Sequence, residues 1–270
     1  MLGAVFLSIL SLPAADWSKE AIFRAPFDGS PDAHVAGGDP KLYHAPNYKP
    51  DAPVTAGLDG TTVRLAKGEG RTGDALHFTR KNTQAIFFKA QGNTPFTATG
   101  GSGTISFWLR LDPDRDLEPG WCDPFQLTDK AYNDCAIWVD FTKDDKPRHF
   151  RLGVFGSLKA WDPMNKGSDG NPVFDGRLVR VKRPSFSRDR WTHVAITLDR
   201  LGAGAGTAQL YVDGQPQGTG SGIAETFQWD LAKASLRLGI DYVGYLDDLT
   251  VFRRALTPAE IAALFAAREW

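Results

Sequence analysis

The 270-residue sequence has few of the residues that most often carry catalysis or metal binding. It contains two cysteines, two methionines and five scattered histidines. The cysteines have no histidine nearby, so the sequence holds no zinc-binding pattern. The motifs H-E-x-x-H and G-x-S-x-G are also absent. These absences exclude the common metalloprotease and serine-hydrolase sites, and we identify no catalytic residue from the sequence.

An excess of charge of either sign is also absent. Lysine and arginine number 31 and aspartate and glutamate 32, which gives a net charge of -1. This balance argues against binding nucleic acid or an anionic membrane through bulk electrostatic attraction.

Long hydrophobic runs are missing except at the start. The run from Leu2 to Leu12 ends at Pro13-Ala14-Ala15 and resembles the apolar part of a secretory signal peptide with its cleavage point. It is too short to cross a bilayer as a helix, and it lacks the usual basic residues before it. We therefore predict a signal peptide at 1–15, a single domain at 16–270, and a secreted, periplasmic or cell-surface location. The alternative is an N-terminal segment that frays.

The two cysteines, Cys122 and Cys135, lie thirteen positions apart. In an exported protein an even pair of this kind is a candidate disulfide that closes one loop. In a cytosolic protein the two residues would be ordinary thiols.

Short alternating segments separated by turn residues run along the chain. In residues 104–111 apolar side chains alternate with Thr, Ser, Trp and Arg, which indicates a strand covered on one side. Asp213-Gly214 supplies the residues that a tight hairpin requires. Thr257 to Glu260 forms a capping box before an apolar helical face. The pattern predicts an all-β antiparallel sandwich, barrel or jelly roll with one short C-terminal helix.

Several of these segments occur in a familiar order. They are GDALHF, GTISFWLRLD, RWTHVAITLD, AQLYVDGQPQG and GYLDDLTVFRRALTPAEI, with FDGSPDAHVAGG near the start. Over roughly residues 20–268 the chain resembles the laminin-G-like, concanavalin A-like jelly-roll domains of bacterial exported proteins. The resemblance implies two curved antiparallel sheets stacked face to face, with the first and last strands adjacent.

The resemblance also implies a structural calcium ion. In relatives, the aspartate of the last strand lies near the opening FDG segment, and together they often hold calcium. Carried over, Asp247 and Asp28 would be side-chain ligands, with Asp32 a further candidate and backbone carbonyls completing a shell of six to eight oxygens.

The residues themselves leave an alternative to calcium open. The period of two puts Asp247 and Asp248 on opposite faces of their strand, so only one of them is expected to be the main ligand. Without a metal ion, Asp247 would pair with Arg253 or Arg254 or would face solvent.

Ligand recognition on such a scaffold is expected to use aromatic rings beside polar groups. The candidate rings are Trp121 and Trp161, both in loops, and His44 with Tyr43 is a further candidate grouping. The alternative for both tryptophans is anchoring of a loop. We interpret Trp138 mainly as sheet packing.

These observations favour an exported, non-catalytic module that binds a polysaccharide, another glycan or a cell-surface protein. One alternative is a hydrolase or lyase of the same fold, although the carboxylate pattern E-x-D-x-x-E of this fold's glucanases is absent. Another is a structural protein–protein interaction domain of an envelope assembly. A cleft with two carboxyl groups of raised pKa would favour the enzyme, an exposed aromatic ring beside polar groups the glycan-binding module, and a flat apolar patch the assembly role.

Overall fold

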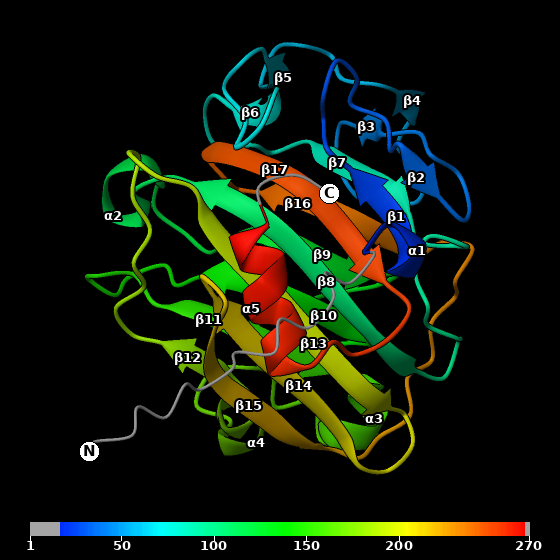
Figure 1. Cartoon of the computed structure of the whole chain (residues 1–270). Helices are drawn as coiled ribbons and strands as arrows, with labels where there is room; N and C mark the ends of the chain where they lie inside the picture. The colour runs from blue at the N-terminus through cyan, green and yellow to red at the C-terminus, as the bar shows by residue number, and fades with distance from the viewer. Residues whose placement is uncertain (1–16, 268–270) are drawn as a thin grey trace, which may run out of the picture.

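Two antiparallel β-sheets pack face to face in the computed structural model, which describes residues 17–267 (Figure 1). The segment 1–15, where we predict a signal peptide, lies outside the described residues. None of the helices within residues 17–267 is long and apolar enough to cross a membrane. The arrangement confirms the all-β jelly-roll sandwich that the sequence predicts.

The first sheet, called sheet A, has nine strands. Its continuous order is β15 (Gln215–Ile223), β14 (Gly206–Val212), β13 (Thr192–Leu201), β8 (Gly101–Arg110), β17 (Gly244–Phe252), β1 (Ala21–Ala25) and β2 (Val35–Ala36). In addition, β6 (Ala75–Phe78) pairs with β17, and β5 (Val63–Ala66) pairs with β6. The first strand, β1, therefore lies beside the last strand, β17, as the resemblance implies.

The second sheet, sheet B, has eight strands. Their order is β12 (Val179–Val181), β11 (Phe150–Phe155), β10 (Ala136–Phe141), β9 (Cys122–Thr128), β16 (Ser235–Ile240), β7 (Ala85–Lys89), β3 (Tyr43–Ala45) and β4 (Thr55–Ala56). Sheet B lies behind sheet A in the view of Figure 1.

The core fills the space between the sheets with the inward-facing side chains of both. Phe107 of β8 stacks on Phe125 of β9 at 5.6 Å between ring centroids, and Phe23 of β1 meets Phe88 of β7 edge-on at 4.8 Å. All four rings are fully buried. Because burying one such side chain stabilises a fold by about 1.5–3 kcal/mol, these contacts between the sheets are a main source of stability.

The described residues form five helices: one short helix precedes β1, three short helices sit in connections between strands, and the longest helix ends the described chain. They are α1 (Trp17–Glu20), α2 (Pro113–Asp116), α3 (Leu158–Trp161), α4 (Pro172–Gly176) and α5 (Pro258–Ala266). The capping box of Thr257 and Glu260 opens α5 as the sequence predicts. Ile261 and Leu264 then pack against Tyr211 of β14, so α5 covers the outer face of sheet A (Figure 1).

The prediction of a disulfide between Cys122 and Cys135 is wrong. Cys122 begins β9 and pairs with Phe141 at the end of β10, whereas Cys135 directly precedes β10. The two cysteines thus lie at opposite ends of an antiparallel strand pair, and both are free and buried. The whole length of β10 separates them, which is farther than a disulfide can reach.

Candidate functional site

A cleft of about 580 Å³ opens on the outer face of sheet B. Its floor is made by β9, β10, β11 and β12, and its rim by the loops around residues 121, 131, 168–175 and 241. The lining side chains are mostly polar or aromatic: Trp121, Asp123, Gln126, Ala131, Tyr132, Trp138, Asp140, Arg151, Ser168, Asp169, Gly170, Phe174, Asp175, Arg180, Ile240 and Asp241. A space of this size lies within the range of small-molecule binding sites.

A buried ion pair forms the centre of the floor. Asp140 of β10 and Arg151 of β11 are cross-strand neighbours. The Arg151 guanidinium donates from Nε to Asp140 Oδ1 at 2.8 Å and from Nη2 to Asp140 Oδ2. Burial raises the pKa of Asp140, and the bidentate pairing with Arg151 opposes this rise. The pair therefore gives the floor both a hydrogen-bond acceptor and a donor.

A second carboxyl group, Asp123, reaches the floor through a β-bulge. Along β9 and β10 the pairing passes from Phe125 opposite Val139 to Cys122 opposite Phe141, so β9 holds one extra residue. As a result, Asp123 and Gln126 face the same side, and Gln126 Nε2 donates to Asp123 Oδ2 at 3.1 Å. Burial raises the pKa of Asp123 well above its usual value, and the nearby negative charge of Asp140 adds to the rise.

Trp138 lines the floor as well, so its role is wider than the sheet packing that we inferred from the sequence. Its indole lies flat over Gly153 of β11, where an added Cβ atom would stand 2.2 Å from the ring. The ring nitrogen donates to the carbonyl oxygen of Tyr132 at 2.6 Å. Gly153 thus makes room for the ring, and the ring holds the loop that carries Tyr132.

At the rim, Trp121 keeps 42% of its surface exposed. The Arg151 guanidinium lies 4.3 Å from the centre of its ring, within cation–π range. The preceding loop is held by the buried Arg148, which donates to the carbonyl oxygens of residues 117, 118, 120 and 142 at 2.8–3.3 Å. One arginine therefore fixes the path of the chain that leads to Trp121.

Trp161 does not serve as a binding platform. It is 6% exposed and packs with Phe155 and Phe174, and its ring nitrogen donates to the carbonyl of Asn133 at 2.8 Å. No ring face is left for a ligand, so Trp161 anchors the loop that follows β11. The alternative reading of this residue is the correct one.

The His44 and Tyr43 grouping lies on β3, near the other edge of sheet B and outside the cleft lining. His44 Nδ1 contacts the carbonyl oxygen of Gly57 at 2.7 Å. Tyr43 stacks on Phe87 of β7, and the ammonium of Lys89 lies 4.7 Å from the centre of the Tyr43 ring. The structure therefore does not bring this grouping together with Trp121.

The predicted calcium ligands lie at the end of sheet A that carries β5 and β6. Asp247 of β17 is fully buried, and its carboxylate accepts from the backbone N–H groups of Arg71 at 2.7 Å and Asp248 at 2.8 Å. Burial, then the charge of Asp248, raises the pKa of Asp247 to about 8, and Asp28 contributes to the rise. Within residues 17–267 no ion pair to Asp247 is found; Arg254 pairs instead with Glu260 at 2.8 Å.

The expectation that Asp247 and Asp248 point to opposite faces is wrong. Pairing with β8 shifts register between Asp247 and Thr250, and Asp248 has a φ of 49°. This bulge brings both carboxyl groups within reach of the negative charge of Asp28, which contributes to the raised pKa of each. Asp248 pairs with Arg24 at 3.2 Å, so its charge is compensated by a side chain.

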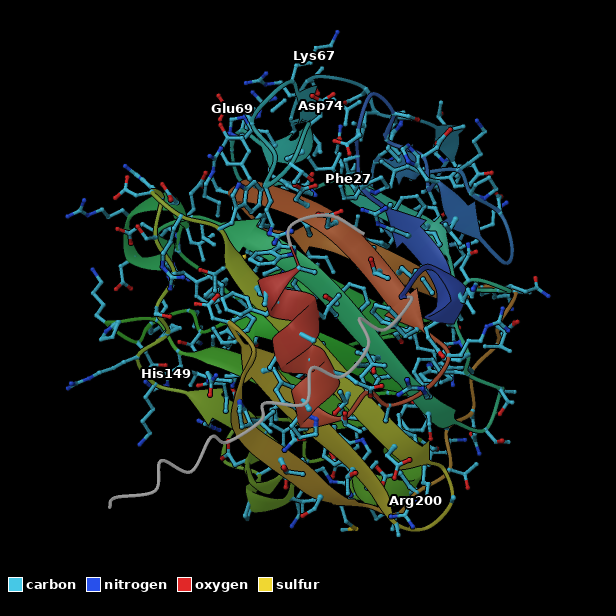
Figure 2. The ribbon with its side chains drawn as sticks, in the orientation of Figure 1. Phe27, Lys67, Glu69, Asp74, His149 and Arg200 are labelled. Atoms are coloured by element: carbon cyan, nitrogen blue, oxygen red, sulfur yellow. The ribbon has the colours of Figure 1, made fainter. Side chains whose placement is uncertain are left out.

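Asp28 is held by the loop between β5 and β6. Its Oδ1 accepts from the backbone N–H of Asp74 at 2.8 Å, and it lies so close to Gly73 that an added Cβ atom would stand 1.9 Å away. Figure 2 places Asp74, Lys67 and Glu69 together at this end of the sandwich. Asp32, in contrast, pairs with Lys41 at 2.7 Å.

These residues are compatible with a calcium ion that uses Asp28 and Asp247. The buried carboxyl of Asp247 has no ion-pair partner within residues 17–267, although the charges of Asp247 and Arg71 interact, and a bound cation would stabilise its ionised form. Among residues 17–267 no three acidic, histidine or cysteine side chains are grouped to hold a metal. Backbone carbonyls would therefore have to supply most of the shell.

The Laminin_G_3 model of the concanavalin A-like lectin/glucanases superfamily matches residues 81–262. This chain belongs to that superfamily. No curated protein gives a significant match.

Solved structures similar to this superfamily member share its fold. Domain 4 of AbnA, a GH43 extracellular arabinanase from Geobacillus stearothermophilus, in complex with arabinotriose, has a TM-score of 0.55 and 19% identity, over 91% of this chain and 98% of that one. The receptor-binding domain of botulinum neurotoxin type G has a TM-score of 0.54 and 12% identity, over 92% of this chain and 51% of that one. The binding domain of botulinum neurotoxin DC in complex with SialylT has a TM-score of 0.54 and 10% identity, over 93% of this chain and 52% of that one. At these identities the likeness establishes the fold alone, and this chain spans about half of each toxin domain.

Proposed function

We propose that the protein is a non-catalytic carbohydrate-binding module whose site is the cleft on the outer face of sheet B. The observation that carries this proposal is the exposed Trp121 ring beside the Asp140–Arg151 pair. A sugar has apolar faces that stack on aromatic rings and hydroxyl groups that need donors and acceptors. The cleft offers both within one space of about 580 Å³.

The similar structures support the same class of ligand. The arabinanase domain is in complex with arabinotriose, and one toxin binding domain is in complex with SialylT. We extend this to a polysaccharide or a cell-surface glycan as the partner of this chain. An exported or cell-surface location, which the apolar N-terminal run favours, would give the cleft access to such ligands.

The test is retention of the protein on immobilised polysaccharides and on a glycan array. We expect retention on a defined glycan and its loss in Trp121→Ala. Tyr43→Ala is the matched control, because Tyr43 is an aromatic residue on the same sheet outside the cleft. Retention by Trp121→Ala equal to that of the unaltered protein would contradict the assignment of the cleft, and retention on no glycan would contradict the function.

We also propose that Asp28 and Asp247 hold a structural calcium ion. Bound there, calcium would neutralise the buried charge and tie β17 to the segment after β1. We expect added calcium to raise the melting temperature of the protein, and Asp247→Ala to remove that rise. An equal rise in Asp247→Ala would contradict the assignment of Asp247 as a ligand.

A glycan-cleaving enzyme is the second candidate, because two carboxyl groups with raised pKa, Asp123 and Asp140, face one cleft. Against this role, Asp140 is bound by both arms of Arg151 and is not free to act as a nucleophile or base. Release of reducing ends from a retained glycan, abolished by Asp123→Asn, would establish the enzyme.

A further inference from the structure

The proposed glycan site has an uneven charge. Five aspartates and two arginines line it. Both arginines are already paired, Arg151 with Asp140 and Arg180 with Asp175. The cleft therefore has no arginine left to receive an acidic sugar, although its rim and floor carry further carboxylates.

Three of the five aspartates gather at one end of the cleft. Asp140 is held by Arg151 and Asp241 lies 3.9 Å from the ammonium of Lys81, whereas Asp123 has no ion pair within residues 17–267. Asp123 comes from β9, Asp140 from β10 and Asp241 from the turn between β16 and β17. The charges of Asp140 and Asp241 both act on Asp123, whereas Arg151 opposes them while held bidentate by Asp140. The only side chain that donates to Asp123 within residues 17–267 is the neutral Gln126.

A bare metal ion does not suit this end of the cleft. Within the described chain, no three acidic, histidine or cysteine side chains lie close enough together to coordinate one. Carboxylates spaced more widely than a metal shell, beside exposed aromatic rings, match a larger organic cation. Tyr132 and Trp121, both 42% exposed, supply those rings at the rim.

We propose that the cleft selects a glycan bearing free ammonium groups, that is, a chain of unacetylated amino sugars such as glucosamine. The ammonium would lie at Asp123, between Asp140 and Asp241, while a face of the sugar stacks on Trp121. This inference rests on the proposed carbohydrate-binding function and adds the chemical class of the ligand. Glycans rich in uronic or sialic acids are disfavoured, because like charges would meet in a partly desolvated space.

The test compares oligosaccharides of one length by titration calorimetry against the full chain: glucosamine oligomers, N-acetylglucosamine oligomers and galacturonate oligomers. We expect the glucosamine oligomer to bind about tenfold or more tightly than its acetylated form, since a charge-assisted hydrogen bond contributes this much. The preference should shrink as salt is added. Galacturonate oligomers should bind weakest.

In Asp123→Asn the affinities for the glucosamine and N-acetylglucosamine oligomers should become nearly equal, while the N-acetylglucosamine oligomer still binds. The matched control is Asp199→Asn, an exposed carboxylate next to Arg200 at the far end of sheet A (Figure 2). It should leave the preference unchanged.

The outcomes separate the two proposals. Equal or tighter binding of the acetylated or acidic oligomers would overturn the ammonium preference and leave the carbohydrate-binding function standing. Binding of none of the oligomers would overturn the ammonium preference alone, because the carbohydrate-binding function is decided by retention on the wider glycan panel. Trilysine bound as tightly as the glucosamine oligomer would show that the cleft takes basic peptides, and this also would overturn the inference.

Discussion

Replacing Arg151 with methionine should destabilise the protein strongly. Arg151 and Asp140 are 6% and 4% exposed and form a bidentate pair on the floor of the cleft. Without Arg151, the Asp140 carboxylate is left buried and unpaired, which costs about 3–5 kcal/mol in comparable sites. For a chain of this length that loss lowers the melting temperature by about 6–10 °C.

Removing both partners should cost far less than the sum of the single changes. In Asp140→Leu with Arg151→Met no buried charge is left, and the methionine still packs against Trp121. We expect this double variant to recover at least about 2 kcal/mol relative to additivity. Its glycan affinity should nevertheless fall about tenfold or more, because the polar floor is gone.

Urea unfolding of the four proteins in the double-mutant cycle measures the coupling, and calorimetry with the retained glycan measures binding. Additive losses of stability would show that the two side chains do not act as a buried pair. Full glycan affinity in the double variant would remove the pair from the binding site.

Three further changes test other parts of the structure. Arg148→Met should cost about 3–5 kcal/mol, because four carbonyl oxygens lose their donor, and should weaken glycan binding by freeing the loop before Trp121; binding left intact would show that the loop holds itself. Trp161→Ala should cost about 3–5 kcal/mol in urea unfolding as a core truncation, and a cost near zero would mean that the ring is not an anchor. For Asp247, whose pKa is raised to about 8 from 3.8, the folded state binds one proton more than the unfolded state between those values. In chelator, stability from this group is therefore full below about pH 4 and falls by about 1.4 kcal/mol per pH unit until about pH 8; urea unfolding of Asp247→Asn should lack this slope, and an equal slope would refute the shift.

The sequence predicted the elements whose signals are local. The hairpin turn at Asp213-Gly214, with φ of 49° and 73°, joins β14 to β15 as expected. The capping box at Thr257 opens α5. In each case the residues that specify the structure are neighbours in the chain, so no knowledge of tertiary contacts is needed.

Apart from Trp121, the polar residues of the cleft could not be predicted, for a physical reason that occurs twice in the fold. Strict alternation puts Asp123 and Gln126 on opposite faces of a strand, and a bulge in β9 brings them to one face. The same device, at Asp248, overturned the expected geometry of the calcium candidates in β17. A bulge depends on how a strand pairs with its partner, and alternation within one strand does not reveal it.

Trp161 is a residue whose exposure the sequence predicts wrongly. Gly, Pro and Asp residues around it indicated an exposed loop, yet one turn of helix, α3, turns the ring inward against Phe155 and Phe174. An outward-facing pattern was present elsewhere: Trp138 and Asp140 alternate with core residues in β10, and Arg151 does so in β11. Polar residues at the outward positions of otherwise apolar strands were the signal that could have located the cleft.

The two outer faces of the sandwich differ: the paired strands β1 and β17 and the helix α5 lie on the side of sheet A, and the cleft lies on the side of sheet B. The first strand, β1, and the last helix, α5, both lie with sheet A, whereas the cleft opens on the outer face of sheet B. A support or a neighbouring domain that holds the outer face of sheet A would therefore leave the cleft facing outward. Copies strung along a scaffold could each present an unobstructed cleft, so weak individual contacts with a repeating polymer would add up to firm attachment.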